Sequence, residues 1–334
     1  MWKKHLTDKE KEEIDEKRKQ DIDNASKLIE AGVKEYLSSD KYISVLKNIS
    51  KFHQYSFNNS ILIMMQNPTA SAVASFASWK SNFNRSVKKD EKGIKIFVPI
   101  EYKIYDPKID PITKKEILDN NGKPIKEYNG EKGLTYKIGY VFDIEQTKQI
   151  EGKEVIPLNF EISDLSGNIQ NYKSLLNALI NTSPVPIDFK NFDSEAKGYF
   201  SPTNEEIVVQ SGMSELQTLK TVIHETAHSL LHNIPKLSEF KEKGIEFSRE
   251  DKETQAESVA FIVAYHYGLD TSEYSFPYVA TWIENSNMIH KNMNLIQETA
   301  DYIITEMDKN LEQQKMISTD KNMEIDEEEI EMEM

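Results

Sequence analysis

The chain has 334 residues, a net charge of −15 and no cysteine, and this length predicts about two domains. The lack of cysteine excludes disulfides and thiolate metal sites and is compatible with a reducing cytoplasm. Neither a signal-peptide pattern nor an apolar run of membrane-spanning length is found. We therefore expect a cytoplasmic protein with no membrane partner.

The charges are divided unevenly along the chain. Residues 1–150 hold 27 Lys and Arg against 22 Asp and Glu, whereas residues 151–334 hold 14 against 34. The positive excess lies in residues 51–100, with 7 basic and 2 acidic residues. This asymmetry predicts that the front half meets a polyanion and that the back half does not.

Residues 1–50 read as a charged, amphipathic helical lead-in. Residues 55–67 look like a buried helix that ends before Pro68. Phe76 and Trp79 are three apart and share a helical face.

A basic turn at residues 85–93 precedes a strand at 94–100, which is expected to pair with a second strand at 139–144. Residues 101–135 between them read as a hairpin excursion. Aromatic rings beside a lysine-rich turn suit single-stranded nucleic acid, because bases stack on rings and phosphates meet lysines. The simpler alternative, which composition alone favours, is that the rings are core and the lysines keep a loop soluble.

The second predicted domain spans residues 149–316, after a first domain at 51–148. It contains a helix at 172–180 and short strands at 185–189, 198–200 and 206–210. The strand at 206–210 either lines a cleft and pairs with extended substrate or is purely structural. The acidic segment 317–334 reads as a disordered tail.

The strongest motif is His-Glu-Thr-Ala-His at 224–228, inside an apolar segment predicted as a helix over 215–232. Residues four apart share a helical face, so His224 and His228 can grip one metal ion, with Glu225 able to reach a water on it. Chance spacing is the alternative, but an apolar helix has no structural reason to bury these polar groups. Zinc suits two imidazoles, a carboxylate and a water.

The third ligand should come from another helix. His232 lies two turns beyond His224, about 12 Å along the axis, so we expect it behind the ligands or in the core. Glu253 and Glu257 share a face of a later helix that continues to residue 267. We predict Glu253 as the ligand and Glu257 as the hydrogen-bond acceptor of a ligand histidine, with the reverse left open.

The chemistry this group suggests is peptide hydrolysis, with Glu225 as the general base. Tyr265, His266 and Tyr278 could donate to an oxyanion, although packing is the simpler expectation. Two rival hypotheses remain: a non-catalytic DNA-binding protein with a structural or vestigial metal site, and a DNA-acting hydrolase. Structural zinc sites have no need of Glu225, and nucleases usually carry two-metal carboxylate clusters.

Several segments in order, namely 55–60 (YSFNNS), 75–80 (SFASWK), 92–96 (KGIKI) and 141–147 (VFDIEQT), resemble the N-terminal domain of ArdC-type antirestriction proteins. The HExxH motif, the ExxAE at 253–257 and the block 274–282 resemble that family's zincin-like metallopeptidase domain. The chain departs from the family in its longer hairpin, in Asn58 where a glycine is expected, and in the acidic tail.

The resemblance implies an α+β fold of two domains. A small antiparallel-sheet and helix domain would bind single-stranded DNA, and a mostly helical domain would carry zinc and cut an unknown protein or peptide. It implies a protein of conjugative plasmids and mobile elements that shields entering DNA from restriction. The candidate DNA contacts are Phe57, Trp79, Arg85, Lys88, Lys89 and Lys92.

Overall fold

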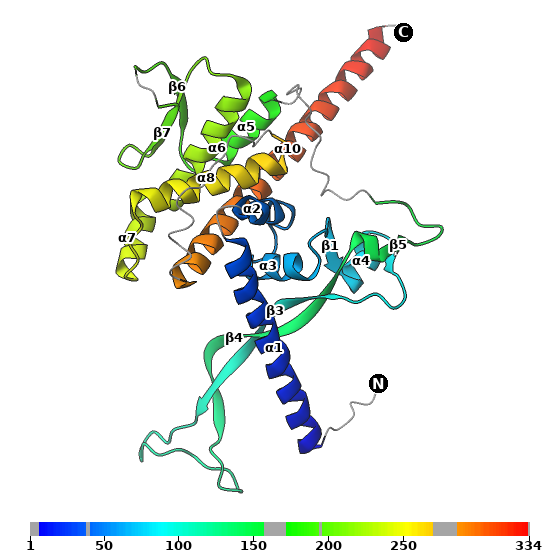
Figure 1. Cartoon of the computed structure of the whole chain (residues 1–334), viewed down its shortest axis with the longest axis vertical. Coiled ribbons are helices and arrows are strands. Elements are labelled where there is room, and N and C mark those ends of the chain that lie inside the picture. Colours follow the sequence, from blue (N-terminus) through cyan, green and yellow to red (C-terminus); the bar gives the residue numbers. More distant parts are fainter. Residues whose placement is uncertain (1–6, 38–40, 157–171, 194–195, 270–285, 333–334) are drawn as a thin grey trace.

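The computed structural model describes residues 7–37, 41–156, 172–193, 196–269 and 286–332 (Figure 1). Helices and small sheets alternate along the chain, which confirms the predicted α+β class. Among the described helices, none combines the length and the apolar character needed to cross a bilayer.

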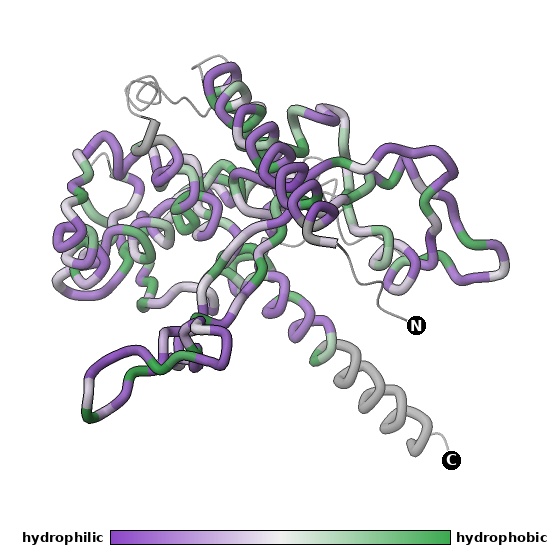
Figure 2. The backbone as a smooth tube through the Cα atoms, turned by 90° about the horizontal axis from the view of Figure 1, so that it is seen from below, coloured by the Kyte–Doolittle hydropathy of each residue, from purple (hydrophilic) through white to green (hydrophobic). Residues whose placement is uncertain are grey.

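The chain opens with helices α1 (Asp8–Tyr36), α2 (Tyr42–Lys51) and α3 (Phe57–Gln66). A capping box between Thr7 and Glu10 starts α1. Most of the length of α1 is hydrophilic, as its colouring in Figure 2 shows, and only one stripe is buried against the core. The helix predicted before Pro68 is confirmed, because α3 ends at Gln66.

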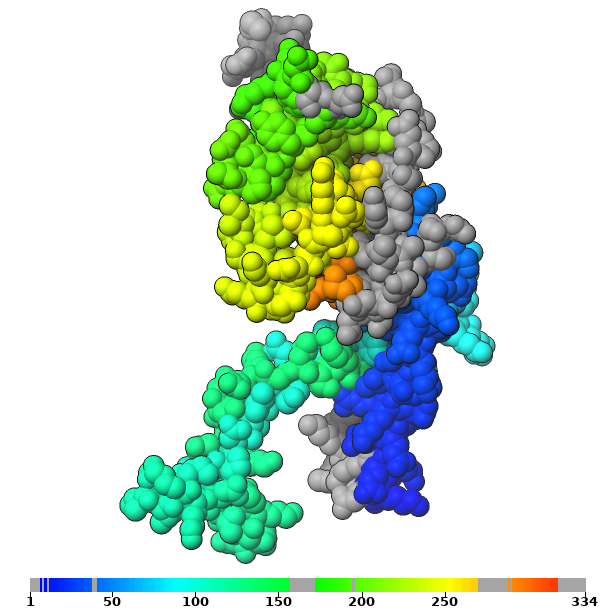
Figure 3. Space-filling view, turned by 60° about the vertical axis from the view of Figure 1, so that its left-hand side comes forward, coloured from blue at the N-terminus to red at the C-terminus, as the bar shows by residue number. Residues whose placement is uncertain are grey.

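The first sheet has the strand order β1-β4-β3, with β1 at Val73–Ser75, β3 at Ile94–Pro107 and β4 at Lys126–Asp143. The predicted antiparallel pairing is confirmed, since Ile94 lies opposite Val141. Both strands run much further than predicted and form an arm that stands clear of the body (Figures 1 and 3).

Beside this sheet lie four short elements, which are α4 (Phe76–Asn82), β2 (Arg85–Val87), η1 (Ile144–Gln146) and β5 (Thr147–Gln149). They pack around Trp79, which is completely buried and donates its Nε1–H to the carbonyl oxygen of Phe142 at 2.7 Å. A satisfied indole at the centre of a small cluster fixes the orientation of α4 on the sheet.

The second sheet has the order β6-β8-β7, with β6 at Ile187–Lys190, β7 at Gly198–Ser201 and β8 at Glu206–Gln210. β6 runs parallel to β8, and β7 runs antiparallel to it. The strand predicted at 206–210 is thus the middle strand, with a neighbour on each side. Of the two alternatives for this strand, the structural one therefore holds, and among the described strands β7 is the edge strand on that side.

The larger helices follow, with α5 (Tyr172–Thr182) before the sheet and α6 (Glu215–Leu231), α7 (Ile234–Glu242), α8 (Arg249–His266) and α10 (Ser286–Met332) after it. α6 packs on the sheet and against α8, while α10 lies against α8 and α5. Gly268 has a φ of +68° just past α8, which agrees with the predicted end of this helix at about residue 267.

One hydrophobic core joins the two ends of the chain. Leu46 and Ile61 from the N-terminal helices share a buried cluster with Val259 of α8 and Ile303 of α10. α2 and α8 are also linked by a hydrogen bond between the Tyr42 and Ser258 hydroxyls, at 2.9 Å. The N-terminal helices therefore brace the helices that carry the predicted metal site. The domain boundaries at 50 and 148 stay a prediction.

The acidic tail is a correction to the sequence analysis. α10 continues through Met332 and so includes most of the segment expected to be disordered. The physical reason is local composition: residues 286–332 contain neither glycine nor proline and are rich in helix-forming Glu, Met and Lys.

Candidate metal centre

Helix α6 places the two histidines of the motif. Ser214 caps the helix by accepting a hydrogen bond from the backbone N–H of Gln217. The apolar face of α6, including Leu219 and Ile223, is fully buried. His224 and His228 are left together on the adjoining face, with their Nε2 atoms 3.1 Å apart. Two nitrogen lone pairs directed at one point are what a metal ligand pair requires.

Helix α8 brings Glu253 to the same point. Ala256 and Ala260 are fully buried and small, so that α8 approaches α6 closely. The Oε2 atom of Glu253 lies 3.5 Å from His224 Nε2 and 3.6 Å from His228 Nε2. The ligand atoms of these three residues all lie within 4.8 Å of one another. They form the group that could hold a metal ion, from the elements and residues that the sequence predicted.

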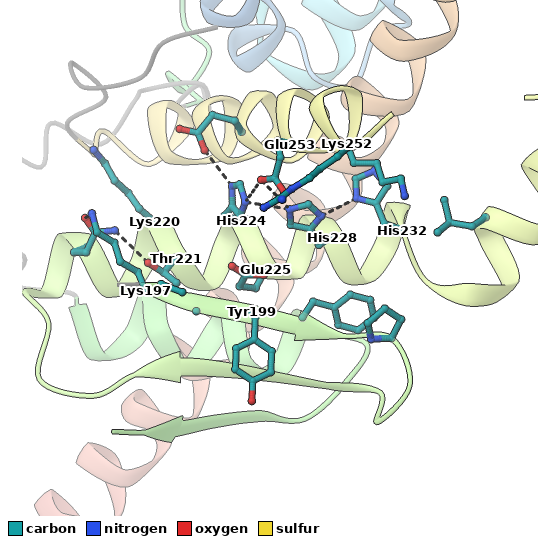
Figure 4. A pocket seen from close by; sticks show the side chains of 18 residues that line it. Lys197, Tyr199, Lys220, Thr221, His224, Glu225, His228, His232, Lys252 and Glu253 are labelled. Carbon is teal, nitrogen blue, oxygen red and sulfur yellow. Dashed lines mark hydrogen bonds and ion pairs between the residues drawn. The ribbon is translucent and has the colours of Figure 1, made fainter. Parts of the chain in front are cut away.

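Glu257 lies one turn further along α8, on the outer side of His224. Its Oε2 accepts a hydrogen bond from His224 Nδ1 at 3.1 Å, which leaves Nε2 facing Glu253 and His228 (Figure 4). The geometry therefore favours Glu253 as the ligand and Glu257 as the residue that orients a ligand ring.

The carboxylates set the charge of the group. Burial acts to lower the pKa of His224, but the hydrogen bonds that its ring donates to Glu253 and Glu257 outweigh this effect and raise the pKa to about 10. The hydrogen bonds to His224 and His228 hold the pKa of Glu253 well below its usual range. A proton shared in this way occupies the place that a cation takes, so a metal ion must displace it to bind.

Glu225 lies next to the pair and is only 7% exposed. Burial raises its pKa, while the two neighbouring imidazoles and the backbone N–H of Phe200 act to lower it. A carboxyl group whose pKa is raised toward neutrality is suited to take and return a proton.

His232 lies behind the ligands. Its Nδ1 is 2.8 Å from His228 Nδ1, and its Nε2 is 2.7 Å from Gln255 Oε1. Gln255 in turn donates to Asn292 at 2.6 Å. Burial and the nearby His228 lower the pKa of His232 to about 3. The residue therefore contacts a ligand from the buried side, as the helical spacing predicts.

A cleft of about 830 Å³ opens over the group. Its walls come from β7, α6 and the first turns of α8, and Figure 4 shows Tyr199 of β7 with its ring turned away from the histidines. Gly198 is required where β7 meets α6, because a Cβ there would lie 2.7 Å from Cγ2 of Thr221. Because all three predicted ligands line this cleft, they are reachable from solvent.

Two of the three oxyanion candidates, Tyr265 and His266, are not among the residues that line this cleft. Tyr265 stacks on Phe261, with ring centroids 6.0 Å apart. His266 Nδ1 bonds to the carbonyl oxygen of Ser50 at 3.3 Å. Both residues pack α8 against α2, so their oxyanion role is wrong. Tyr278 lies outside the described residues.

Two of the predicted DNA contacts are wrong. Phe57 is 1% exposed and packs its ring on His290, and Trp79 is completely buried. A side chain inside the core cannot stack on a base. The reason is that helical spacing gives the shared face of two aromatic residues but not the side on which the next element packs.

The other predicted contacts lie on the surface or near it. Lys88, Lys89 and Lys92 are exposed in the turn between β2 and β3, and Lys88 Nζ donates to the carbonyl oxygen of Glu145 at 2.6 Å. Arg85 is half-buried and donates to the Thr147 hydroxyl at 2.7 Å, which gives it a structural partner. Their role in binding stays a prediction.

Phe76 was considered in the sequence analysis only as the partner of Trp79 and is absent from the candidate DNA contacts. It is 58% exposed at the first position of α4, and its ring lies in a T-shaped arrangement with the ring of Phe142. The signal was Ser75, a helix-capping residue directly before it: a side chain on the first helical residue projects from the end of the helix.

The fold and the geometry define an α+β protein with a group of two histidines and a glutamate that could hold a metal ion. Residues 8–142 match the family model of the N-terminal domain of anti-restriction factor ArdC. The chain therefore carries an N-terminal domain of the ArdC type, as the sequence motifs predicted.

The chain is also similar to two proteins, one of which has two crystal structures. A Bacillus anthracis protein, pXO2-81, is 30% identical over 98% of the chain, and the chain spans 57% of that protein's length. The antirestriction ArdC protein of plasmid R388 is 19% identical in its metal-free crystal structure, which covers 75% of this chain and 85% of its own, with a TM-score of 0.42. For its Mn(II)-bound structure the identity is 16%, the coverage 84% and 98%, and the TM-score 0.46.

Proposed function

We propose that the C-terminal half is a zinc-dependent metallopeptidase and that the N-terminal domain binds single-stranded DNA. The observation that carries the first part is the convergence of His224, His228 and Glu253 beside a buried Glu225. The second part rests on the ArdC-type N-terminal domain and its exposed lysines.

The donor set fits a zinc ion. Two imidazole nitrogens and one carboxylate oxygen come from two packed helices, and the open side of the group faces the cleft. Three protein ligands with an open position are typical of catalytic zinc, whereas structural zinc is usually enclosed by four. A bound zinc ion would lower the pKa of a water molecule and polarise a substrate carbonyl.

The chain's own residues supply the remaining steps. Glu225 takes the proton from the attacking water and returns it to the leaving amine, as its raised pKa suits. Glu257 holds the His224 ring, and the buried His232 holds the His228 ring, so both Nε2 atoms stay directed at the centre. The free edge of β7 can hold an extended peptide beside them.

The test is cleavage of a mixed peptide library by the zinc-loaded protein, compared with Glu225→Gln. This substitution removes the base and keeps the three ligands, so cleavage should fall by at least about 100-fold with zinc content unchanged. Glu215→Gln, at the exposed start of the same helix, is the matched control. If no peptide is cut by the parent protein, the peptidase proposal fails.

The single-stranded DNA proposal places the contacts on the outer face of the small domain. Phe76 offers an exposed ring on α4, and Lys80 lies four residues further on the same exposed face. With the lysines at 88, 89 and 92 they provide one stacking surface and several phosphate partners. In the biological setting that the family suggests, the protein would coat entering plasmid DNA during conjugation and shield it from restriction.

The DNA proposal is tested with a fluorescent single-stranded oligonucleotide. Phe76→Ala should weaken binding by about 1–3 kcal/mol, as for one stacked base. The control is Ile112→Ala, which changes an exposed side chain on the arm. Phe83→Ala is unsuitable as a control because Phe83 packs on Trp79. Equal affinities for Phe76→Ala and the parent protein would contradict the proposal that Phe76 is a stacking site.

Survival of DNA protection in Glu225→Gln, without any peptide cleavage, would favour the alternative of a non-catalytic binding protein.

A further inference from the structure

The charges that line the cleft differ from those of the sequence around it. Residues 151–334 carry 14 basic and 34 acidic residues. The cleft is lined by four of those basic residues, Lys197, Lys220, Arg249 and Lys252, and by three of the acidic ones. All three acidic residues belong to the candidate metal centre itself. Outside the metal centre, every Asp, Glu, Lys or Arg side chain among the lining residues is therefore a cation, although residues 151–334 are strongly acidic.

The cations stand on both sides of the metal ligands. Figure 4 shows Lys197 and Lys220 on one side of His224 and Lys252 on the other. Arg249 and Lys252 begin α8, and in the part of the chain that the structure describes neither forms an ion pair with an acidic side chain. Lys197 donates to the amide oxygen of Gln217 rather than to a carboxylate. Among the described residues, Lys197, Arg249 and Lys252 therefore carry charges without a carboxylate partner, and they lie on either side of the centre.

The edge of β7 decides which kind of anion fits. Gln210 N–H bonds to the carbonyl oxygen of Lys197, and in an antiparallel pair such bonded positions alternate. Gly198 and Phe200 therefore turn their backbone groups to the free edge, and the Phe200 N–H reaches Glu225. An extended peptide complements such an edge by strand addition, whereas a nucleic acid strand has no backbone groups that continue a sheet.

We propose that the cleft takes an acidic peptide, with Asp or Glu side chains on both sides of the bond that is cut. This inference rests on the proposed peptidase function and adds the class of substrate. The peptide lies along β7 with its reacting carbonyl at the centre. Its flanking carboxylates meet Lys197 at one end and Arg249 and Lys252 at the other.

The experiment compares a labelled peptide that carries Glu and Asp on both sides of a central apolar pair with its Gln and Asn counterpart. Binding to the zinc-loaded full chain with Glu225→Gln is measured by fluorescence anisotropy, and cleavage is measured with Glu225 intact. The acidic peptide should bind about tenfold more tightly or better at low salt, and the difference should shrink as salt rises.

The discriminating variant is Arg249→Gln with Lys252→Gln, which should remove most of the preference for the acidic peptide. Its matched control is Lys173→Gln with Lys241→Gln, two exposed lysines outside the cleft, which should leave the preference intact. Because all four side chains are at least partly exposed, these variants are expected to fold.

Three results are decisive. Equal binding of the acidic and amide peptides overturns the inference, while cleavage of both would leave the peptidase proposal standing. Tight binding of the acidic peptide without cleavage supports the inference and contradicts the peptidase. Displacement of the acidic peptide by a single-stranded oligonucleotide, through a site that depends on Arg249 and Lys252, overturns the inference in favour of a nucleic-acid cleft.

Discussion

The metal centre and the basic turn at residues 88–92 hold their charged groups in opposite ways. In the centre, His224 and His228 are largely buried between two packed helices, and every ring nitrogen has a partner. In the turn, the lysines project into solvent from a short connection. A buried constellation is fixed by packing, so one lost partner disturbs the rest, whereas exposed charges act almost independently.

The comparison also concerns aromatic residues. Trp79 and Phe76 are neighbours on α4, yet the first is inside a small core and the second is outside. Trp79→Ala should therefore destabilise the protein by about 3–5 kcal/mol, as for a large buried aromatic residue. Phe76→Ala should change stability by about 0.5 kcal/mol or less. Chemical denaturation of both variants measures this contrast, and similar losses in the two would show that Phe76 is also structural.

In the metal centre, the two glutamates of α8 should differ in effect. Glu253→Gln removes a predicted ligand and should weaken zinc binding by about 100-fold or more, whereas Glu257→Gln keeps an oxygen that accepts from His224 and should cost about tenfold. Competition with a chromophoric chelator gives both affinities. The reverse order would assign the ligand role to Glu257.

The pH dependence of zinc binding tests the metal centre without any substitution, because a proton competes with the metal ion there. Because the pKa of His224 is raised to about 10 without metal, a bound ion must displace a proton at neutral pH. Zinc affinity should therefore rise about tenfold per pH unit from pH 7 toward 10, and fall as pH decreases. Calorimetry in buffers of different ionisation enthalpy counts the released proton. An affinity that does not change over this range would contradict the shared-proton geometry.

The turn should show the smallest effect of single substitutions. Lys89→Gln should weaken binding of single-stranded DNA only a few-fold and lower the slope of log affinity against log salt by about 0.7. Stability should not change, since Lys89 is exposed. Titrations at several salt concentrations measure the slope. A slope unchanged by substitution of all three lysines would place the DNA elsewhere.

The sequence predicted the metal centre better than the DNA contacts for a physical reason. Ligands on α6 are set by a spacing of four residues, and Glu253 follows from the small alanines that let α8 approach. Burial of Trp79 depends instead on β4, some 60 residues away, whose Phe142 carbonyl accepts its hydrogen bond. Likewise, the edge position of β7 is a property of the whole sheet and is absent from its local pattern.

The central claim is that His224, His228 and Glu253 bind one divalent cation. The most direct test is the zinc content of the purified full chain after loading and dialysis, measured by mass spectrometry for the parent protein, His228→Ala and the control His290→Ala. His290 packs on Phe57 away from the centre. We predict about one ion per chain for the parent and the control and none for His228→Ala. An ion retained by His228→Ala, or none in the parent protein, would contradict the account.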